Sequence, residues 1–257
     1  MSAMSTLTPL APTMEELGQW LQRQTPGHGT VQATVLHHTW SPSAAEFQGR
    51  STIEAIRRYH MEVRGFSDIA ANAYACPDGT VITGRPLSAG NWAHALVSRS
   101  HPEAEAAAIA GGNKQFFNYY AFGLETVANF DREPIHSGPS GVSYETALQV
   151  MTVVHTVYRL LPDRLFFHRD IADKTCPGTR LDRATFRAEL GRRLRGAIMA
   201  DVDSWARAYV ERAIEEGLMS RDAHGKFRGN DPITRQETAV VVVRLLDKFR
   251  QEIRALR

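Results

Sequence analysis

Residue types that bind metal ions stand at the ends of two predicted strands and in the loop that follows the second of them. The pair His37-His38 ends an apolar, β-rich run that begins at Val31, and His168 ends a second short apolar run. Cys176 follows in the segment HRDIADKTCPG. Two imidazoles and one thiolate are ligands that Zn²⁺ prefers, and three protein ligands leave the fourth tetrahedral position open for water. The pattern predicts a catalytic zinc site without deciding which histidine of the pair is the ligand.

Zinc in such a site would lower the pKa of its water to about 7 and would polarise a carbonyl group. A structural zinc site would normally have a fourth protein ligand and closely spaced Cys-x-x-Cys pairs, which this chain lacks. Taken singly, a His-His pair and a cysteine before proline are both typical of structural roles. A further alternative is a cysteine peptidase or amidase, in which Cys176 is a thiolate nucleophile with a histidine base. Sensitivity to a chelator separates the two chemistries.

Strands and helices that must position these residues follow from the hydrophobic pattern. Apolar β-rich runs predict strands at 31–38, 69–76, 80–83, 119–127 and 165–168. Amphipathic periodicity predicts helices at 14–24, 51–64, 144–161 and 182–196. We expect Thr13 to cap the first helix, and Ser51 with Glu54 to form a capping box at the second. Because the two kinds of element are interleaved, the sequence predicts an α/β fold with a central mixed β-sheet flanked by helices.

Composition excludes several classes of protein. The 257 residues carry 30 Lys+Arg against 28 Asp+Glu, a net charge of +2, which argues against a nucleic-acid partner bound through a basic surface. Two cysteines make no disulfide scaffold. We expect Cys76 to be a buried thiol with no bridge to Cys176. No apolar stretch reaches the ~20 residues of a membrane-spanning helix, so no membrane partner is expected.

The character of the chain changes near Gly196. We expect one domain at 1–197, with its core at about 30–195, and a small all-α domain at 198–257 with helices at 203–217 and 233–254. The N-terminal segment lacks a basic region followed by an apolar one, so it does not read as a secretory signal. The expected location is therefore the cytoplasm until another factor releases the protein.

Five motifs occur in order along the first domain: VLHHTWSP, DIAANAYACPDGTVITGR, WAHA, GLETVANFD and HRDIADKTCPGT. Together they resemble the type 2 N-acetylmuramoyl-L-alanine amidase family, which includes the phage T7 lysozyme type and the peptidoglycan-recognition proteins. The resemblance covers about residues 30–195. It implies an enzyme that cleaves the amide between N-acetylmuramic acid and L-alanine in bacterial peptidoglycan. It also implies that Zn²⁺ is bound by His37, His168 and Cys176.

The same resemblance implies roles for three further residues. Glu125 in GLETV matches the catalytic glutamate of one branch, a general base and then acid; the alternative is a salt-bridged strand glutamate. The phage T7 branch instead uses a tyrosine in the hairpin strand, where this chain has Ala71. Lys174 matches a cationic residue that would stabilise the oxyanion. His94 in WAHA matches a groove residue that contacts glycan or peptide in relatives, with a structural histidine as the alternative.

Residues 201–248 resemble an S-layer homology module, on pieces such as Trp205 and the Thr-Arg-Gln-Glu stretch at 234–237. The resemblance implies binding to a secondary cell-wall polymer. Arg235 would then meet an anionic sugar substituent, since a guanidinium matches the geometry of a carboxylate. The family usually has several copies in tandem, and this chain has one. The alternative is a helical hairpin that only forms a homodimer through the apolar run Val240–Leu246.

A cutting domain joined to a wall-binding domain, without a signal peptide, looks like a phage endolysin that waits in the cytoplasm for a holin. Two other classes stay open. One is a non-catalytic peptidoglycan-recognition protein; relatives that only bind tend to lose the cysteine ligand, which is present here as Cys176. The other is an interaction protein, for which the sequence offers no feature.

Overall fold

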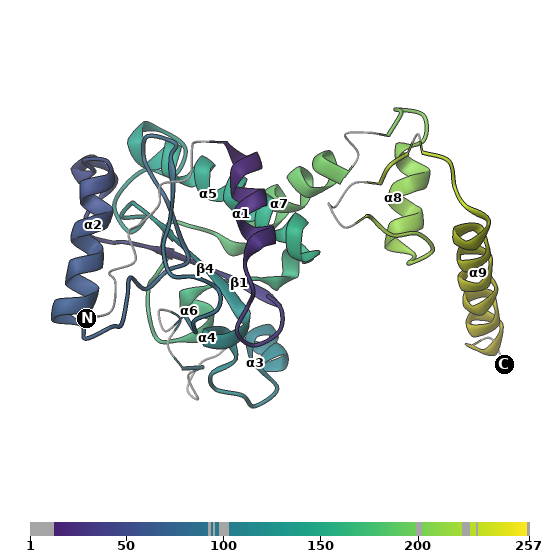
Figure 1. Cartoon of the computed structure of the whole chain (residues 1–257), viewed down its shortest axis with the longest axis horizontal. Helices are drawn as coiled ribbons and strands as arrows, with labels where there is room; N and C mark the ends of the chain where they lie inside the picture. Colours follow the sequence, from purple (N-terminus) through teal and green to yellow (C-terminus); the bar gives the residue numbers. More distant parts are fainter. Residues whose placement is uncertain are drawn as a thin grey trace. The chain divides into compact units, whose positions relative to one another are not determined.

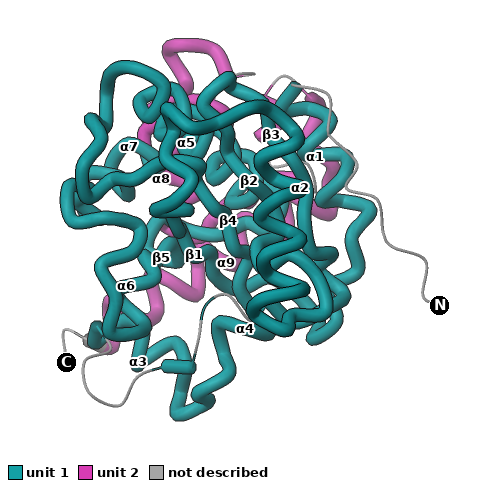
Figure 2. Tube along the Cα trace, turned by 90° about the vertical axis from the view of Figure 1, so that its left-hand side faces the viewer, with its two compact units in different colours: residues 1–191 teal, residues 192–257 magenta. Residues whose placement is uncertain are grey.

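The computed structural model of the protein describes residues 13–91, 94, 96–97, 103–198, 202–222, 227–229 and 231–255. The chain divides into two compact units, residues 1–191 and 192–257 (Figure 2). Helix α7 (Arg183–Ile198) contains the boundary between them. Among the helices in the described ranges, none is long and apolar enough to cross a membrane.

A five-stranded mixed sheet forms the centre of the first unit (Figure 1). Its strands are β1 (Ala33–His38), β2 (Ala73–Ala75), β3 (Val81–Thr83), β4 (Ala121–Thr126) and β5 (Leu165–Phe167). They lie in the order β3-β2-β4-β1-β5. Strand β1 is parallel to β4 and β5, β2 is parallel to β4, and β3 is antiparallel to β2. The predicted central mixed sheet is confirmed.

Helices cover both faces of the sheet. They are α1 (Met14–Arg23), α2 (Arg50–Arg58) with a π-helical turn at Tyr59–Val63, α3 (Ala104–Ala110), α4 (Phe116–Tyr120), α5 (Gly138–Tyr158), α6 (His168–Ile171) and α7. Because side chains alternate along a strand, Ala33 and Val35 of β1 pack in one cluster with α3 and α4. Thr34, between them, faces α5, where its Oγ1 lies 2.9 Å from Nε2 of His155. The predicted α/β class with flanking helices is confirmed.

The two predicted helix caps differ in outcome. The side chain of Thr13 accepts a hydrogen bond from a backbone N–H in the first turn of α1, as predicted. The capping box predicted for Ser51 and Glu54 is wrong. Helix α2 begins at Arg50, one residue earlier than predicted, and Gly49 is its N-cap with a φ of 73°. Ser51 therefore lies inside the first turn and does not cap the helix. Glu54 instead pairs with Arg50 at 2.8 Å.

The described part of the second unit consists of helices and loops. Its helices are α8 (Arg207–Glu215) and α9 (Arg235–Ala255), within the predicted helix at 203–217 and close to the one at 233–254. A small core joins Val202 and Val210 to the partly buried side chains of Ala206, Ile214 and Phe227. The helical C-terminal region therefore agrees with the predicted fold class.

Candidate metal centre

The last two residues of β1 point to opposite faces of the sheet. Nδ1 of His37 lies 3.6 Å from Sγ of Cys176. Nδ1 of His38 instead accepts a hydrogen bond of 3.1 Å from the backbone N–H of Phe130. Both side chains are buried. Strand alternation therefore separates a pair that the residues alone left undecided, and it is His37 that faces the cysteine.

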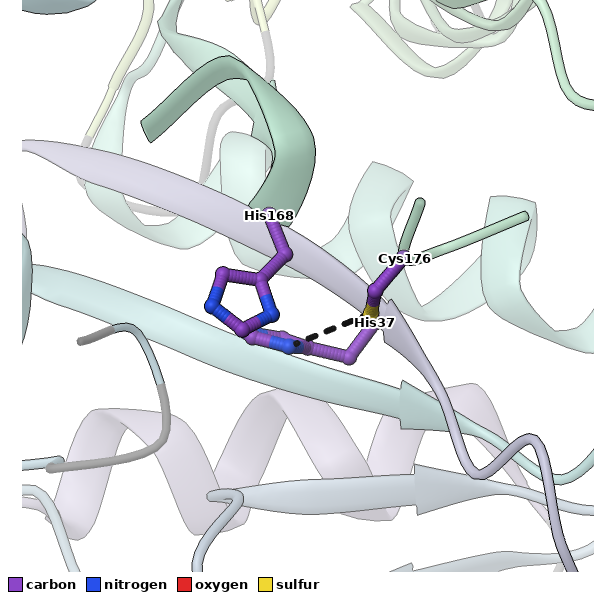
Figure 3. Close-up of side chains that lie close together, drawn as sticks. All are labelled: His37, His168 and Cys176. Carbon is purple, nitrogen blue, oxygen red and sulfur yellow. Dashed lines mark hydrogen bonds between the residues drawn. The ribbon is translucent and has the colours of Figure 1, made fainter. Parts of the chain in front are cut away.

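His37, His168 and Cys176 converge from three elements (Figure 3). Strand β5 is the neighbour of β1, and His168 is the first residue after it, at the start of α6. Its ring centroid lies 4.5 Å from that of His37. One ligand atom from each of the three residues lies within 4.8 Å of the others. This group is a candidate metal centre at the C-terminal ends of two parallel strands.

Hydrogen bonds from Arg169 hold the loop that contains Cys176 in place. Its guanidinium donates to the backbone oxygens of Gly178 at 2.5 Å and Leu181 at 2.6 Å. Its backbone N–H donates to the oxygen of Cys176 at 2.8 Å. The thiol in turn accepts from the backbone N–H of His38 at 3.5 Å. The cysteine is therefore tied both to the residue after His168 and to the end of β1.

The donor set fits Zn²⁺. Nε2 of His168 is buried without a hydrogen-bond partner among the described residues, as expected of a nitrogen that is available to bind a metal ion. Burial lowers the pKa of His168 to about 4 and that of His37 well below its usual value, so both imidazoles are neutral donors at pH 7. Two neutral imidazoles and one thiolate are a known donor set for zinc.

The environment of Cys176 opposes the cysteine-nucleophile alternative. A nucleophilic cysteine needs a thiol pKa lowered by a nearby positive charge. Here burial raises the pKa of the Cys176 thiol well above its usual range, and Glu125 raises it further. Burial therefore disfavours a thiolate at this position when no cation is bound.

Glu125 lies directly opposite His37 in the parallel register of β1 and β4. Burial raises the pKa of its carboxyl group to about 8. Within the described part of the chain, no hydrogen bond or ion pair holds this carboxylate. The salt-bridged alternative therefore has no partner there, and the raised pKa is suited to proton transfer near neutral pH.

A groove of about 820 Å³ leads to Glu125 between the loop after β1 and helix α2. Its lining includes Trp40, Gln48, Thr52, Tyr59, His60 and Glu125. The side chains of Trp40 and Tyr59 are 56% and 50% exposed. Sequence reasoning missed these two aromatic residues. The available signal was the position of Trp40, two residues after the His-His pair at a strand end.

Lys174 and His94, the two other predicted site residues of the first unit, differ in solvent exposure. Lys174 is exposed on the loop before Cys176. Its charge, after burial, contributes to the lowered pKa of His168, so it acts at short range on the cluster. His94 is fully buried, and its Nδ1 lies 2.8 Å from Nε2 of His37. The substrate contact predicted for His94 stays a prediction.

Arg235, in the second unit, is the first residue of α9 and is exposed. The flanking Thr234 and Glu237 form a capping box: Thr234 N–H and Oγ1 each contact Oε2 of Glu237 at 2.8 Å, and Glu237 N–H donates to Thr234 Oγ1 at 3.1 Å. A hollow of about 790 Å³ in this unit is lined by Arg228 and Arg244, among other described residues. The Thr-Arg-Gln-Glu stretch at 234–237 thus contains a helix cap as well as the predicted binding residue.

Two family models match different parts of the chain. Residues 27–179 match the N-acetylmuramoyl-L-alanine amidase family, and residues 199–239 match the S-layer homology domain. No curated protein matches the chain.

Among solved structures, the chain is similar to Drosophila PGRP-LB, with 18% identity over 61% of this chain and 80% of that chain and a TM-score of 0.43. It is similar to the Ph2119 endolysin from a Thermus scotoductus bacteriophage, with 22% identity over 68% and 95% and a TM-score of 0.40. Human PGRP-IBETAC, solved with glycosamyl muramyl pentapeptide, has 17% identity over 62% and 85% and a TM-score of 0.43. Because the family match at 27–179 spans more than half of the chain, this protein belongs to the N-acetylmuramoyl-L-alanine amidase family and carries an S-layer homology domain after it.

Proposed function

We propose that the protein is a zinc-dependent peptidoglycan hydrolase that cleaves the amide between the lactyl group of N-acetylmuramic acid and L-alanine. The observation that carries this proposal is the convergence of His37, His168 and Cys176 beside Glu125 at the end of a groove. His37, His168 and Cys176 would hold the ion. When bound, zinc supplies Lewis-acid chemistry: it makes water more acidic and polarises a carbonyl oxygen.

Glu125 performs the proton transfers in this proposal. Its carboxylate takes a proton from the water that attacks the lactyl carbonyl carbon, and delivers it to the nitrogen of L-alanine as the C–N bond breaks. One water is consumed, and the products are a lactyl carboxylate and a free amino group. The reaction needs Glu125 ionised at its start. A cation held by the three ligands would favour that form and would counteract the raised pKa of about 8.

Lys174 and the groove have separate tasks. Lys174 is exposed, and its charge is felt at His168; in this proposal its ammonium group would stabilise the negative charge that develops on the carbonyl oxygen. Trp40 and Tyr59 offer apolar ring surface in a groove whose other lining side chains are largely polar. That mixture suits a ligand with both sugar rings and amide groups, which peptidoglycan provides.

Identification of the new chain ends in digested peptidoglycan tests the activity. Free amino groups on L-alanine support the proposal, whereas new reducing sugars would mean a glycosidase and refute it. Activity is expected to disappear in EDTA and to return with zinc. Glu125→Gln is expected to retain zinc and to lose activity about 10²- to 10⁴-fold. Binding of peptidoglycan without any new ends, by a zinc-loaded wild-type chain, would favour the non-catalytic alternative.

The second unit supports a role at the cell wall. We propose that it binds a secondary cell-wall polymer with the help of Arg235, and that the whole chain acts as an endolysin. Sedimentation with purified cell walls tests the first part: Arg235→Ala is expected to lower the bound fraction, while Arg254→Ala, near the far end of α9, leaves it unchanged. Lysis that starts only after the membrane of producing cells is permeabilised supports the second part. A chain that is dimeric in solution and binds walls equally well without Arg235 would favour the homodimer alternative.

A further inference from the structure

His94 occupies a niche that a missing side chain leaves open. A Cβ atom at Gly123, in the middle of β4, would lie 2.5 Å from Cε1 of His94 and 2.4 Å from Nδ2 of Asn91. The side chain of Asn91 cannot easily move away, because Oδ1 of Asn72 accepts hydrogen bonds of 2.8 Å from both Asn91 Nδ2 and the backbone N–H of Gly123. Only glycine at position 123 therefore leaves room for the imidazole of His94.

This niche brings His94 against the side of His37 that is turned away from the cysteine. His37 Nε2 lies 2.8 Å from His94 Nδ1, while His37 Nδ1 faces Sγ of Cys176 at 3.6 Å. A neutral imidazole carries one N–H. If Nδ1 offers its lone pair to a metal ion, the proton must be on Nε2, and His94 Nδ1 is then the acceptor that fixes it there.

We infer that His94 is a positioning residue of the metal centre: its Nδ1 holds His37 in the tautomer and ring orientation that present Nδ1 to the ion. The inference rests on the proposed zinc site. His94 is fully buried and is not among the lining residues of the groove that leads to Glu125, so the inferred role is exerted through its contact with His37. Hydrogen-bond partners of metal-binding histidines typically contribute 10- to 100-fold to metal affinity.

Two variants separate the hydrogen bond from simple packing. In His94→Asn, the amide oxygen lies close to the position of Nδ1 and can accept from His37 Nε2–H. In His94→Leu, the side chain fills space and accepts nothing. Zinc affinity of the full-length chain, measured by competition with a chromogenic chelator, is expected to fall about 10- to 100-fold in His94→Leu and to recover in His94→Asn. The visible spectrum of the cobalt-loaded chain is expected to shift in the leucine variant alone.

Stability without metal serves as the control. Melting temperatures in EDTA show whether each variant keeps its fold. Gly123→Ala supplies a further test if the leucine variant does not fold, because its Cβ displaces His94 without changing a proposed ligand, and zinc affinity is expected to fall.

Zinc binding by His94→Leu within twofold of wild type would overturn the inference. So would equal losses of affinity in the asparagine and leucine variants at unchanged stability. A wild-type chain that binds no zinc at all would instead overturn the proposed function, so the two failures are distinguishable.

Discussion

Acid is expected to destabilise the first unit through His155, a buried histidine of α5 outside the metal centre. Its Nε2 lies 2.9 Å from Oγ1 of Thr34 in β1, and its Nδ1 lies 3.3 Å from the backbone oxygen of Leu160. Burial lowers the pKa of His155 to about 4. In the unfolded chain, a histidine titrates near ~6.5.

The sign of the effect follows from these two values. Between pH 6.5 and 4 the unfolded chain binds a proton that the folded chain does not, so stability falls as pH falls through this interval. Each pH unit removes about 1.4 kcal/mol. The free energy of unfolding therefore loses about 2 kcal/mol by pH 5 and about 3 kcal/mol by pH 4 from this one group. Above pH 6.5, His155 contributes no pH dependence.

Urea unfolding from pH 7 to pH 4.5, followed by tryptophan fluorescence in EDTA, measures this contribution. Two histidines of the metal centre and two next to it also have lowered pKa values, so wild type alone does not isolate His155. The difference in free energy of unfolding between wild type and His155→Gln isolates it. This difference is expected to shrink by about 2 kcal/mol between pH 7 and pH 5. The matched control is His136→Gln, at an exposed histidine. A wild-type-to-variant difference that stays constant with pH would refute the reasoning.

Three further changes test other parts of the structure. Arg169→Ala removes both guanidinium bonds to the cysteine loop; it is expected to cost about 1.5–3 kcal/mol of stability and to weaken zinc binding, unlike the exposed control Arg180→Ala. Thr234→Ala breaks the capping box of α9; urea unfolding and far-ultraviolet circular dichroism are expected to show a loss of about 0.5–2 kcal/mol and frayed helix, and unchanged traces would contradict the cap. Trp40→Ala is expected to raise KM for soluble muropeptide about 2- to 10-fold with kcat nearly unchanged, because an aromatic contact contributes roughly 0.5–1.5 kcal/mol.

Sequence patterns predicted the sheet well because its strands are short apolar runs with turn signals beside them. The ends of β1 and β5 bear the histidines that the pattern picked out, and parallel neighbours bring their C-terminal ends to one edge. The choice between His37 and His38 needed either the family resemblance or strand alternation in the structure. The metal and catalytic roles of these residues stay predictions that the experiments above address.

Other features depended on packing that no local pattern reports. Helices α3, α4 and α6 have 7, 5 and 4 residues, too few for a periodic signal. Of the strand expected at 69–76, the regular strand β2 comprises only Ala73–Ala75. The residues before β2 form a buried loop, in which the guanidinium of Arg85 donates hydrogen bonds to the backbone oxygens of Asp68 and Ile69.

The contact between His94 and His37 was equally hidden. The two residues are 57 positions apart, and their hydrogen bond depends on a glycine in a third segment. Residue-type reasoning could place His94 in a groove or in the core, but it could not place it against a proposed ligand.

The sheet positions the proposed ligand His37 relative to the proposed proton-transfer residue Glu125, whereas a loop positions the third proposed ligand, Cys176. Because His37 and Glu125 are opposite residues of adjacent parallel strands, backbone hydrogen bonds fix their separation. Cys176 depends on Arg169 and on the contacts of its thiol with His37 and His38 at the end of β1. Weakening the loop therefore removes a ligand while leaving Glu125 opposite His37. An Arg169→Ala chain saturated with zinc is expected to regain activity with the wild-type pH profile, whereas Glu125→Gln stays inactive at any zinc concentration. If excess zinc does not restore the Arg169 variant, the loop must also position a group that acts on substrate, and Lys174 is the residue to examine.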